Sequence, residues 1–140
     1  MAARRAWAPY QRNTFVTPPF AGHVSGHSTF SRAGAEVLTE FTGSKYFPGG
    51  LGEKQAPRDH FLHFEIGPTE DIVLQWASFY DAADEAGISR LWGGIHVKVD
   101  DRRGRILGAR VGKDAWAPAQ RYYSGIGDTA DGSGPEPGPR

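Results

Sequence analysis

Apolar residues recur at helical spacing in three stretches of the chain, and each stretch predicts a helix. The first runs from Ser28 to Gly43, ends at that glycine, and carries an apolar series of Phe30, Ala33, Val37 and Phe41. The second covers residues 68–87, where Thr69 is placed to cap the helix and Gly87 to end it. Its apolar stripe consists of Ile72, Trp76, Phe79, Ala83 and Ala86. The third runs from about Val97 to Tyr122.

The segments between and around these helices lack helical periodicity. Residues 1–24 are expected to be irregular because the prolines in "TPPFAGH" block a helix. Residues 44–59 read as a loop, and "HFLHFEI" (60–66) as a short strand-like piece. Residues 125–140 form a glycine- and proline-rich tail that we expect to be disordered. The chain therefore divides into an irregular segment 1–24, an all-α core 25–124 and the tail 125–140.

Three glycines lie at four-residue spacing in the third predicted helix. Gly104, Gly108 and Gly112 share one helical face, and each interior glycine costs about 1 kcal/mol relative to alanine. The alternative to a structural role is chance in a chain with 19 glycines. We favour close packing of a second helix on this face.

Composition narrows the function classes. The 140 residues correspond to one domain or part of one, with net charge zero and a pI of about 7.0, so no global charge favours nucleic acid. There is no cysteine, which excludes disulfides and thiolate metal sites. No apolar run is long enough to span a bilayer. The start has no signal-peptide pattern, and nothing else indicates a localisation.

The stretch "SRLWGGIHVKVD" brings together residues that suit an anion site. His96 and Asp100 are four residues apart and can meet on one helical face, where the carboxylate would fix the imidazole tautomer. Arg90 offers a planar fork for oxyanions, and the glycines after it allow a close backbone approach. Taken singly, each residue is better explained as an ordinary helix pair or a solvated loop cation.

A second stretch, "HVSGHSTF", supports the same chemistry. Ser25, Gly26 and His27 stand immediately before the first predicted helix, whose N-terminal N–H groups attract anions. With Arg90 and His96 they could hold a phosphate-like tetrahedral group. The two stretches together make an anion site the better interpretation.

These two stretches resemble motifs of a known family. "SGH" and "SRLWGGIHVKVD" are similar to the second and third signature motifs of vanadium-dependent haloperoxidases and the related type 2 phosphatidic acid phosphatases. The third follows the pattern Ser-Arg, five residues, His, three residues, Asp. Neighbouring segments resemble the bacterial haloperoxidase branch, over roughly residues 8–122. The resemblance implies a partial helical bundle of that type, vanadate as cofactor, and hydrogen peroxide with a halide or small organic substrate as partners.

The resemblance also implies roles for individual residues. His96 would bond to vanadium, or act as the nucleophile in a phosphatase, and Asp100 would orient it. His27 would be the acid–base group. Arg90, Ser25 and the Gly26 N–H would hold the oxyanion. Phe20 falls where the family has a residue near the halide.

Two features depart from the family pattern. His23 and Val24 stand where a proline usually precedes the motif serine, so His23 is either a third imidazole of the site or a surface residue. The family's first motif, a lysine followed after six residues by Arg-Pro, is missing. We therefore expect a C-terminal portion of a longer enzyme with weakened anion affinity. Other basic or imidazole side chains are not placed by any motif, and the two histidines among them are expected to face solvent: Lys45, Lys54, Lys98, His60 and His63.

Three functions follow from these observations. The first is vanadate-dependent halide oxidation by peroxide. The second is a phosphomonoesterase with a histidine nucleophile. The third is a non-catalytic fragment that folds on a partner, for which uncovered apolar stripes would also promote self-association.

Overall fold

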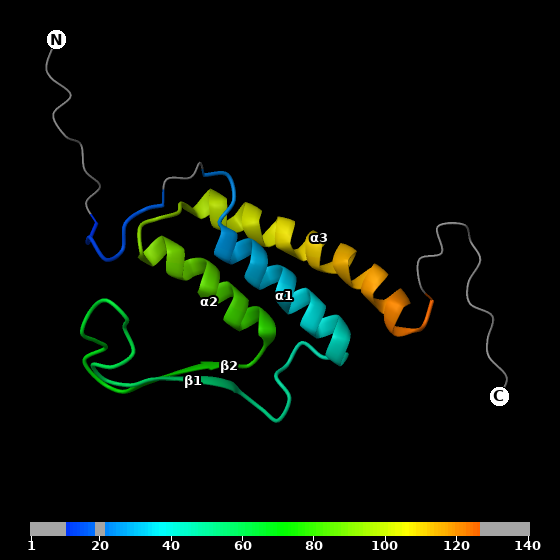
Figure 1. Cartoon of the computed structure of the whole chain (residues 1–140), viewed down its shortest axis with the longest axis horizontal. Helices are drawn as coiled ribbons and strands as arrows, with labels where there is room; N and C mark the ends of the chain where they lie inside the picture. Colours follow the sequence, from blue (N-terminus) through cyan, green and yellow to red (C-terminus); the bar gives the residue numbers. More distant parts are fainter. Residues whose placement is uncertain (1–10, 19–21, 127–140) are drawn as a thin grey trace, which may run out of the picture.

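The computed structural model describes residues 11–18 and 22–126 and is mostly helical. The elements follow in the order α1 (Gly26–Thr42), β1 (Gly52–Ala56), β2 (Ile72–Trp76), α2 (Phe79–Trp92) and α3 (Lys98–Tyr123). Helix α1 lies between α2 and α3, and the β1–β2 hairpin lies beside α2 (Figure 1). Helices α1 and α3 run in the same direction and α2 in the opposite one (Figure 1). The predicted helical fold is confirmed, with a hairpin added.

The boundaries of α1 agree with the sequence, but its buried side does not follow the apolar series. The Ser25 hydroxyl accepts the Ser28 N–H at 3.3 Å, and Gly43 ends the helix in the left-handed region at φ 70°. Phe30 remains 80% exposed, while the buried residues are Ser28, Ala35 and Glu36. Small and polar side chains therefore form the face of α1 that contacts the other helices.

The glycine face of α3 explains why small and polar side chains of α1 are buried. The prediction of close packing on this face is confirmed. A Cβ atom on Gly104 would lie 2.9 Å from the Ser25 carbonyl oxygen, and one on Gly108 2.2 Å from that of Thr29. One on Gly112 would lie 2.6 Å from the Ala33 oxygen. The backbones of α1 and α3 thus touch along three successive turns, which leaves no room for side chains between them.

A charged network joins the three helices where apolar packing is thin. The Arg105 guanidinium of α3 reaches Asp84 of α2 at 2.7 Å and Asp101 at 2.9 Å. Asp101 also accepts the hydroxyl of Ser28 from α1 at 2.7 Å. In the part of the chain that is described, the buried apolar residues are few: Ala35, Ala56, Phe79, Ala83 and Ile95. Polar contacts therefore add to the glycine contacts in holding these helices together.

The helix predicted over residues 68–87 is wrong in its first half. Residues 72–76 form β2, which pairs antiparallel with β1, and α2 begins only at Phe79. Ser78 and Asp81 form a capping box that sets this start, so Thr69 is not the cap and the stripe from Ile72 to Ala86 is divided between two elements. Helix α2 also continues through Gly87 to Trp92. A Cβ at Gly87 would lie 2.5 Å from an Asp101 oxygen, so this glycine permits a helix contact.

The strand expected in "HFLHFEI" is also wrong, and a strand occurs where a loop was expected. Residues 60–66 belong to the connection between the two strands. β1 is the polar segment "GEKQA", which pairs Gly52 with Trp76 and Ala56 with Ile72. The residues of β1 do not alternate between apolar and polar, so its sequence does not indicate a strand. The pairing with β2 stabilises the strand instead.

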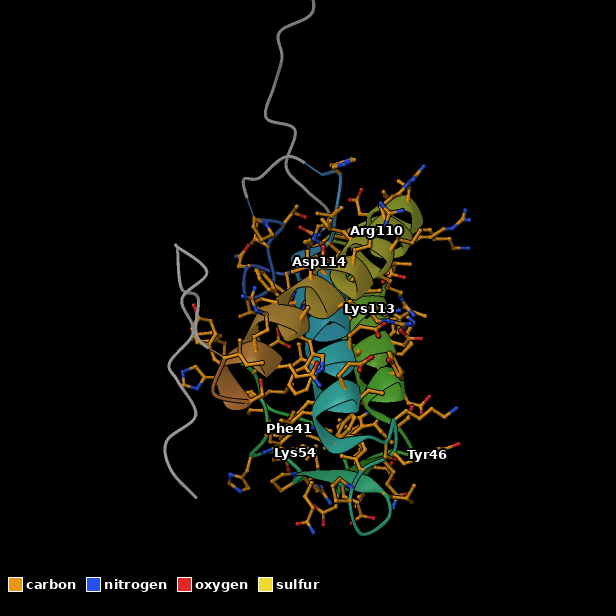
Figure 2. All side chains as sticks on the ribbon, turned by 90° about the vertical axis from the view of Figure 1, so that its right-hand side faces the viewer. Phe41, Tyr46, Lys54, Arg110, Lys113 and Asp114 are labelled. Atoms are coloured by element: carbon orange, nitrogen blue, oxygen red, sulfur yellow. The ribbon has the colours of Figure 1, made fainter. Side chains whose placement is uncertain are left out.

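The third helix is confirmed to within a residue at each end. Aromatic contacts between Phe41 of α1 and Trp116 and Tyr123 of α3, with ring centroids 6.1 and 6.5 Å apart, tie the C-terminal ends together. Figure 2 shows Phe41 at this end, with Arg110, Lys113 and Asp114 along α3. Among the described residues, no helix is long and apolar enough to cross a membrane.

Candidate oxyanion site

The start of α1, the end of α2 and the start of α3 lie together at one end of the molecule (Figure 1). A pocket of about 310 Å³ opens there. It is lined by Pro18, Val24, Gly26, His27, Arg90, Ile95 and His96. The structure thus brings four of the predicted site residues, from both sequence stretches, around one pocket.

His96 and Asp100 form a buried pair, as predicted, but His96 precedes the N-cap Val97 of α3, so the two do not share a helical face. The imidazole Nδ1 lies 3.1 Å from Asp100 Oδ2, and the two side chains are 3% and 10% exposed. The other carboxylate oxygen accepts the His23 backbone N–H at 3.3 Å. These hydrogen bonds, that from His96 foremost, hold the pKa of Asp100 below its ordinary value. Asp100 is therefore an ionised acceptor that orients the ring.

A tight turn connects Arg90 to His96. The N–H groups of Ile95 and His96 both donate to the Arg90 carbonyl, at 3.1 and 3.4 Å. Gly94 adopts φ 68°, and a Cβ on Gly93 would lie 2.2 Å from the Phe15 ring. The two glycines are needed here, one for its backbone conformation and one for the space beside Phe15.

Arg90 is the strongest indication that the pocket suits an anion. Its Nε is buried and has no hydrogen-bond partner among the described residues. Its Cζ lies 5.2 Å from the centroid of the Phe15 ring. Burial lowers the pKa of Arg90, but a guanidinium remains charged at neutral pH. A buried charged donor at a pocket is stabilised by a bound oxyanion.

The N-terminal end of α1 lines the pocket and also contacts α3. Gly26 and His27 line the pocket, and N–H groups in a first turn have no acceptor within their own helix. Ser25 instead is fully buried as the N-cap, and its own N–H donates to the Asp100 carbonyl at 3.1 Å. Ser25 thus joins α1 to α3, and contact of its hydroxyl with an anion stays a prediction.

Several residues singled out from the sequence lie away from the pocket. The His23 side chain is exposed, and its contribution is the backbone N–H to Asp100, made at an unusual φ of 134°. His60 and His63 are exposed, as predicted. Lys54 lies on β1 at the hairpin (Figure 2). The described lining of the pocket contains no lysine, and Phe20 lies outside the described residues.

The structure also reveals residues that sequence reasoning did not identify. Phe15 lies against both Arg90 and Gly93, and the Ser28–Asp101–Arg105 contacts hold the helices that carry the site. Phe15 had no motif to mark it. The four-residue spacing of Asp101 and Arg105 was a readable signal for their ion pair.

We expect anion binding at this site to strengthen as the pH falls. Burial first, then the charges of Arg90 and His96, lower the pKa of His27 in the free protein. A bound anion would raise the pKa again, so binding takes up a proton and tightens as the pH falls through the range around the ordinary imidazole value of 6.5. Sulfate, a dianion throughout this range, is the probe for calorimetry. In His27→Asn the sulfate affinity should depend less on pH. An equally steep pH dependence in this variant would contradict the prediction.

The described residues suit an oxyanion better than a bare cation. Within residues 11–18 and 22–126, no group of three or more histidine, cysteine, aspartate or glutamate side chains is arranged to hold a metal ion. The pocket offers a guanidinium, imidazoles and backbone N–H groups. This donor set fits vanadate or phosphate, whose oxygens accept hydrogen bonds.

Comparison with solved structures shows a shared fold. An apo-type bacterial vanadium-dependent chloroperoxidase matches with a TM-score of 0.67 and 21% identity, over 77% of this chain and 22% of that one. The holo-type structure matches with a TM-score of 0.66 and 21% identity, over 74% and 22%. A bacterial vanadium-dependent iodoperoxidase is 34% identical over 76% and 23%, with a TM-score of 0.45. The chain thus spans about a fifth of the length of these proteins.

Comparison with family models identifies the chain. No curated protein sequence matches it significantly. The model of the VCPO second helical-bundle domain matches residues 1–125, which is most of the chain. Together with the shared fold, this match confirms the expected type of helical bundle. The chain belongs to the family of VCPO second helical-bundle domains.

Proposed function

We propose that this chain carries the oxyanion site of a vanadate-dependent haloperoxidase, which oxidises halide with hydrogen peroxide. The observation that supports this most is the buried Nε of Arg90, which has no hydrogen-bond partner in the described part of the chain and lies beside a pocket that His96 also lines. Family membership adds to it.

Each residue has a role that its contacts favour. Arg90 and the first-turn N–H groups of Gly26 and His27 would hold the vanadate oxygens. Because Asp100 engages Nδ1 of His96, the other ring nitrogen, Nε2, is the atom that would bond to vanadium. Bound vanadate would supply the Lewis acidity that activates peroxide toward halide.

His27 would move the proton in this reaction. It lines the pocket, and its lowered pKa leaves a neutral imidazole in the free protein at neutral pH. With an anion bound this pKa would rise again, so the imidazole could take a proton from hydrogen peroxide and return it to the departing oxygen. The Ser25 hydroxyl, at the N-cap of α1, would donate a further hydrogen bond to the oxyanion.

The exposure of aromatic side chains on α1 also favours a non-catalytic role that depends on a partner. Two aromatic side chains of α1 are largely exposed, Phe30 at 80% and Phe41 at 65%, although the described core is thin. Such a surface favours association with another helical segment or with a second copy of the chain.

One experiment separates these functions. We expect bromination of a phenol dye that requires peroxide, bromide and vanadate together. Hydrolysis of p-nitrophenyl phosphate that vanadate inhibits, without bromination, would establish the phosphomonoesterase instead. Neither activity, in a chain that light scattering shows to be associated, would favour the partner-dependent role.

A further inference from the structure

A second cavity lies between two segments that are far apart in the sequence. It measures about 330 Å³ and is lined by Thr14, Phe15, Leu62, His63, Phe64 and Glu65. The first two come from the N-terminal described segment and the others from the loop between β1 and β2. Glu65 ties the segments together through contacts with Arg12 and Thr14. The cavity is large enough for a small organic molecule.

Phe15 places this cavity beside the oxyanion pocket. Its ring lines the cavity, and the same ring lies 5.2 Å from the Cζ of Arg90, which lines the oxyanion pocket. The Phe15 ring also fills the space above Gly93. A molecule in the cavity would therefore lie one aromatic ring away from the anion-binding arginine.

The lining indicates the class of molecule that would bind. Leu62 and Phe64 are 46% and 76% exposed, so they offer apolar surface that an aromatic ring could cover. The His63 imidazole lies edge-on to Phe64, with ring centroids 4.6 Å apart. Glu65 adds a carboxylate, and the hydrogen bond from Thr14 foremost holds its pKa below the ordinary value. An ionised carboxylate accepts a hydrogen bond from a hydroxyl or amino group.

We propose that this cavity binds a small aromatic substrate bearing a hydroxyl or amino donor and holds it beside the oxyanion pocket. The use of that substrate in halogenation rests on the proposed function, whereas its binding does not. In that reaction a ring C–H bond breaks and a C–halogen bond forms. Peroxide accepts the electron pair that the halide gives up, and its two oxygens leave as two water molecules, which take up the ring proton and one proton from solvent.

Phenol titrated into the full chain without vanadate, followed by calorimetry, tests the site. We expect saturable binding that weakens about ten-fold or more in Phe64→Ser, since an aromatic wall is lost. Phe30→Ser is the matched control, because Phe30 is similarly exposed, at 80% against 76%, but lies on α1. Phenol affinity should be unchanged in this control.

Absence of saturable binding, or equal affinities in the wild type and Phe64→Ser, would overturn the proposal. Equal weakening in both variants would also overturn it, because it would indicate non-specific association. Vanadate titrated into the same samples reports separately on the proposed function. Phenol binding without vanadate binding would refute the haloperoxidase and leave the aromatic site standing.

Discussion

Replacement of His96 by alanine is expected to remove vanadate binding, with a loss of affinity on the order of 100-fold or more. Removal of a group that only orients a metal ligand already costs about 10- to 100-fold, and His96 would be the ligand itself. Its side chain is 3% exposed and is held by Asp100 at 3.1 Å, so its position at the pocket is well defined. Calorimetric titration with orthovanadate measures the loss.

Two further variants sharpen this experiment. His60→Ala removes an exposed imidazole of the loop between the strands and should leave vanadate affinity unchanged. Asp100→Asn keeps the shape of the pair but not its charge, and should weaken binding by roughly ten-fold. Circular dichroism shows whether each variant is folded. Equal vanadate affinity in the wild type and a folded His96→Ala protein would refute the assignment.

Gly108→Ala is expected to destabilise the protein by about 2 kcal/mol. The new methyl group would lie 2.2 Å from the Thr29 carbonyl oxygen, so α1 and α3 must move apart, and overpacking of this kind costs about 1–3 kcal/mol or more. The helix preference of alanine, about 1 kcal/mol, offsets only part of the cost. The charged contacts of Arg105 with Asp84 and Asp101 would be disturbed by the same movement.

Gly34→Ala is the matched control for this substitution. Gly34 is also inside a helix, α1, but a Cβ there meets nothing within 4 Å. This variant should gain up to about 1 kcal/mol from helix propensity alone. Urea unfolding curves of both variants measure the two changes. A Gly108→Ala protein as stable as Gly34→Ala would show that the helices do not touch at Gly108.

Much of the helical fold could be predicted because its signals are local. The C-terminal end of α1 is marked by Gly43, and α3 was predicted to within a residue at each end. The error between residues 68 and 78 arose because short apolar runs fit a strand or a helix equally well. The capping box of Ser78 and Asp81 was a readable signal for the true start of α2.

The candidate site also combines local features that the sequence predicts with contacts that only the fold creates. The contact of His96 with Asp100 was predicted from their four-residue spacing, although His96 lies before the first residue of α3 and the contact spans the start of the helix. The pocket itself requires α1 to lie against α3, and that approach depends on three glycines and on a charged network across three helices. No motif indicated that Ser25 would be buried or that His23 would contribute its backbone N–H.

By itself the sequence determined the residue chemistry of this protein, two of its three helices, and the pairing of His96 with Asp100. These features depend on neighbours within a few residues, whose geometry is set by backbone periodicity. Only the tertiary structure decided the hairpin, the burial of Ser25 and of Arg90 Nε, and the position of Phe15 between two cavities. These features depend on contacts between distant segments, and such contacts form only when backbones meet and water is excluded between them.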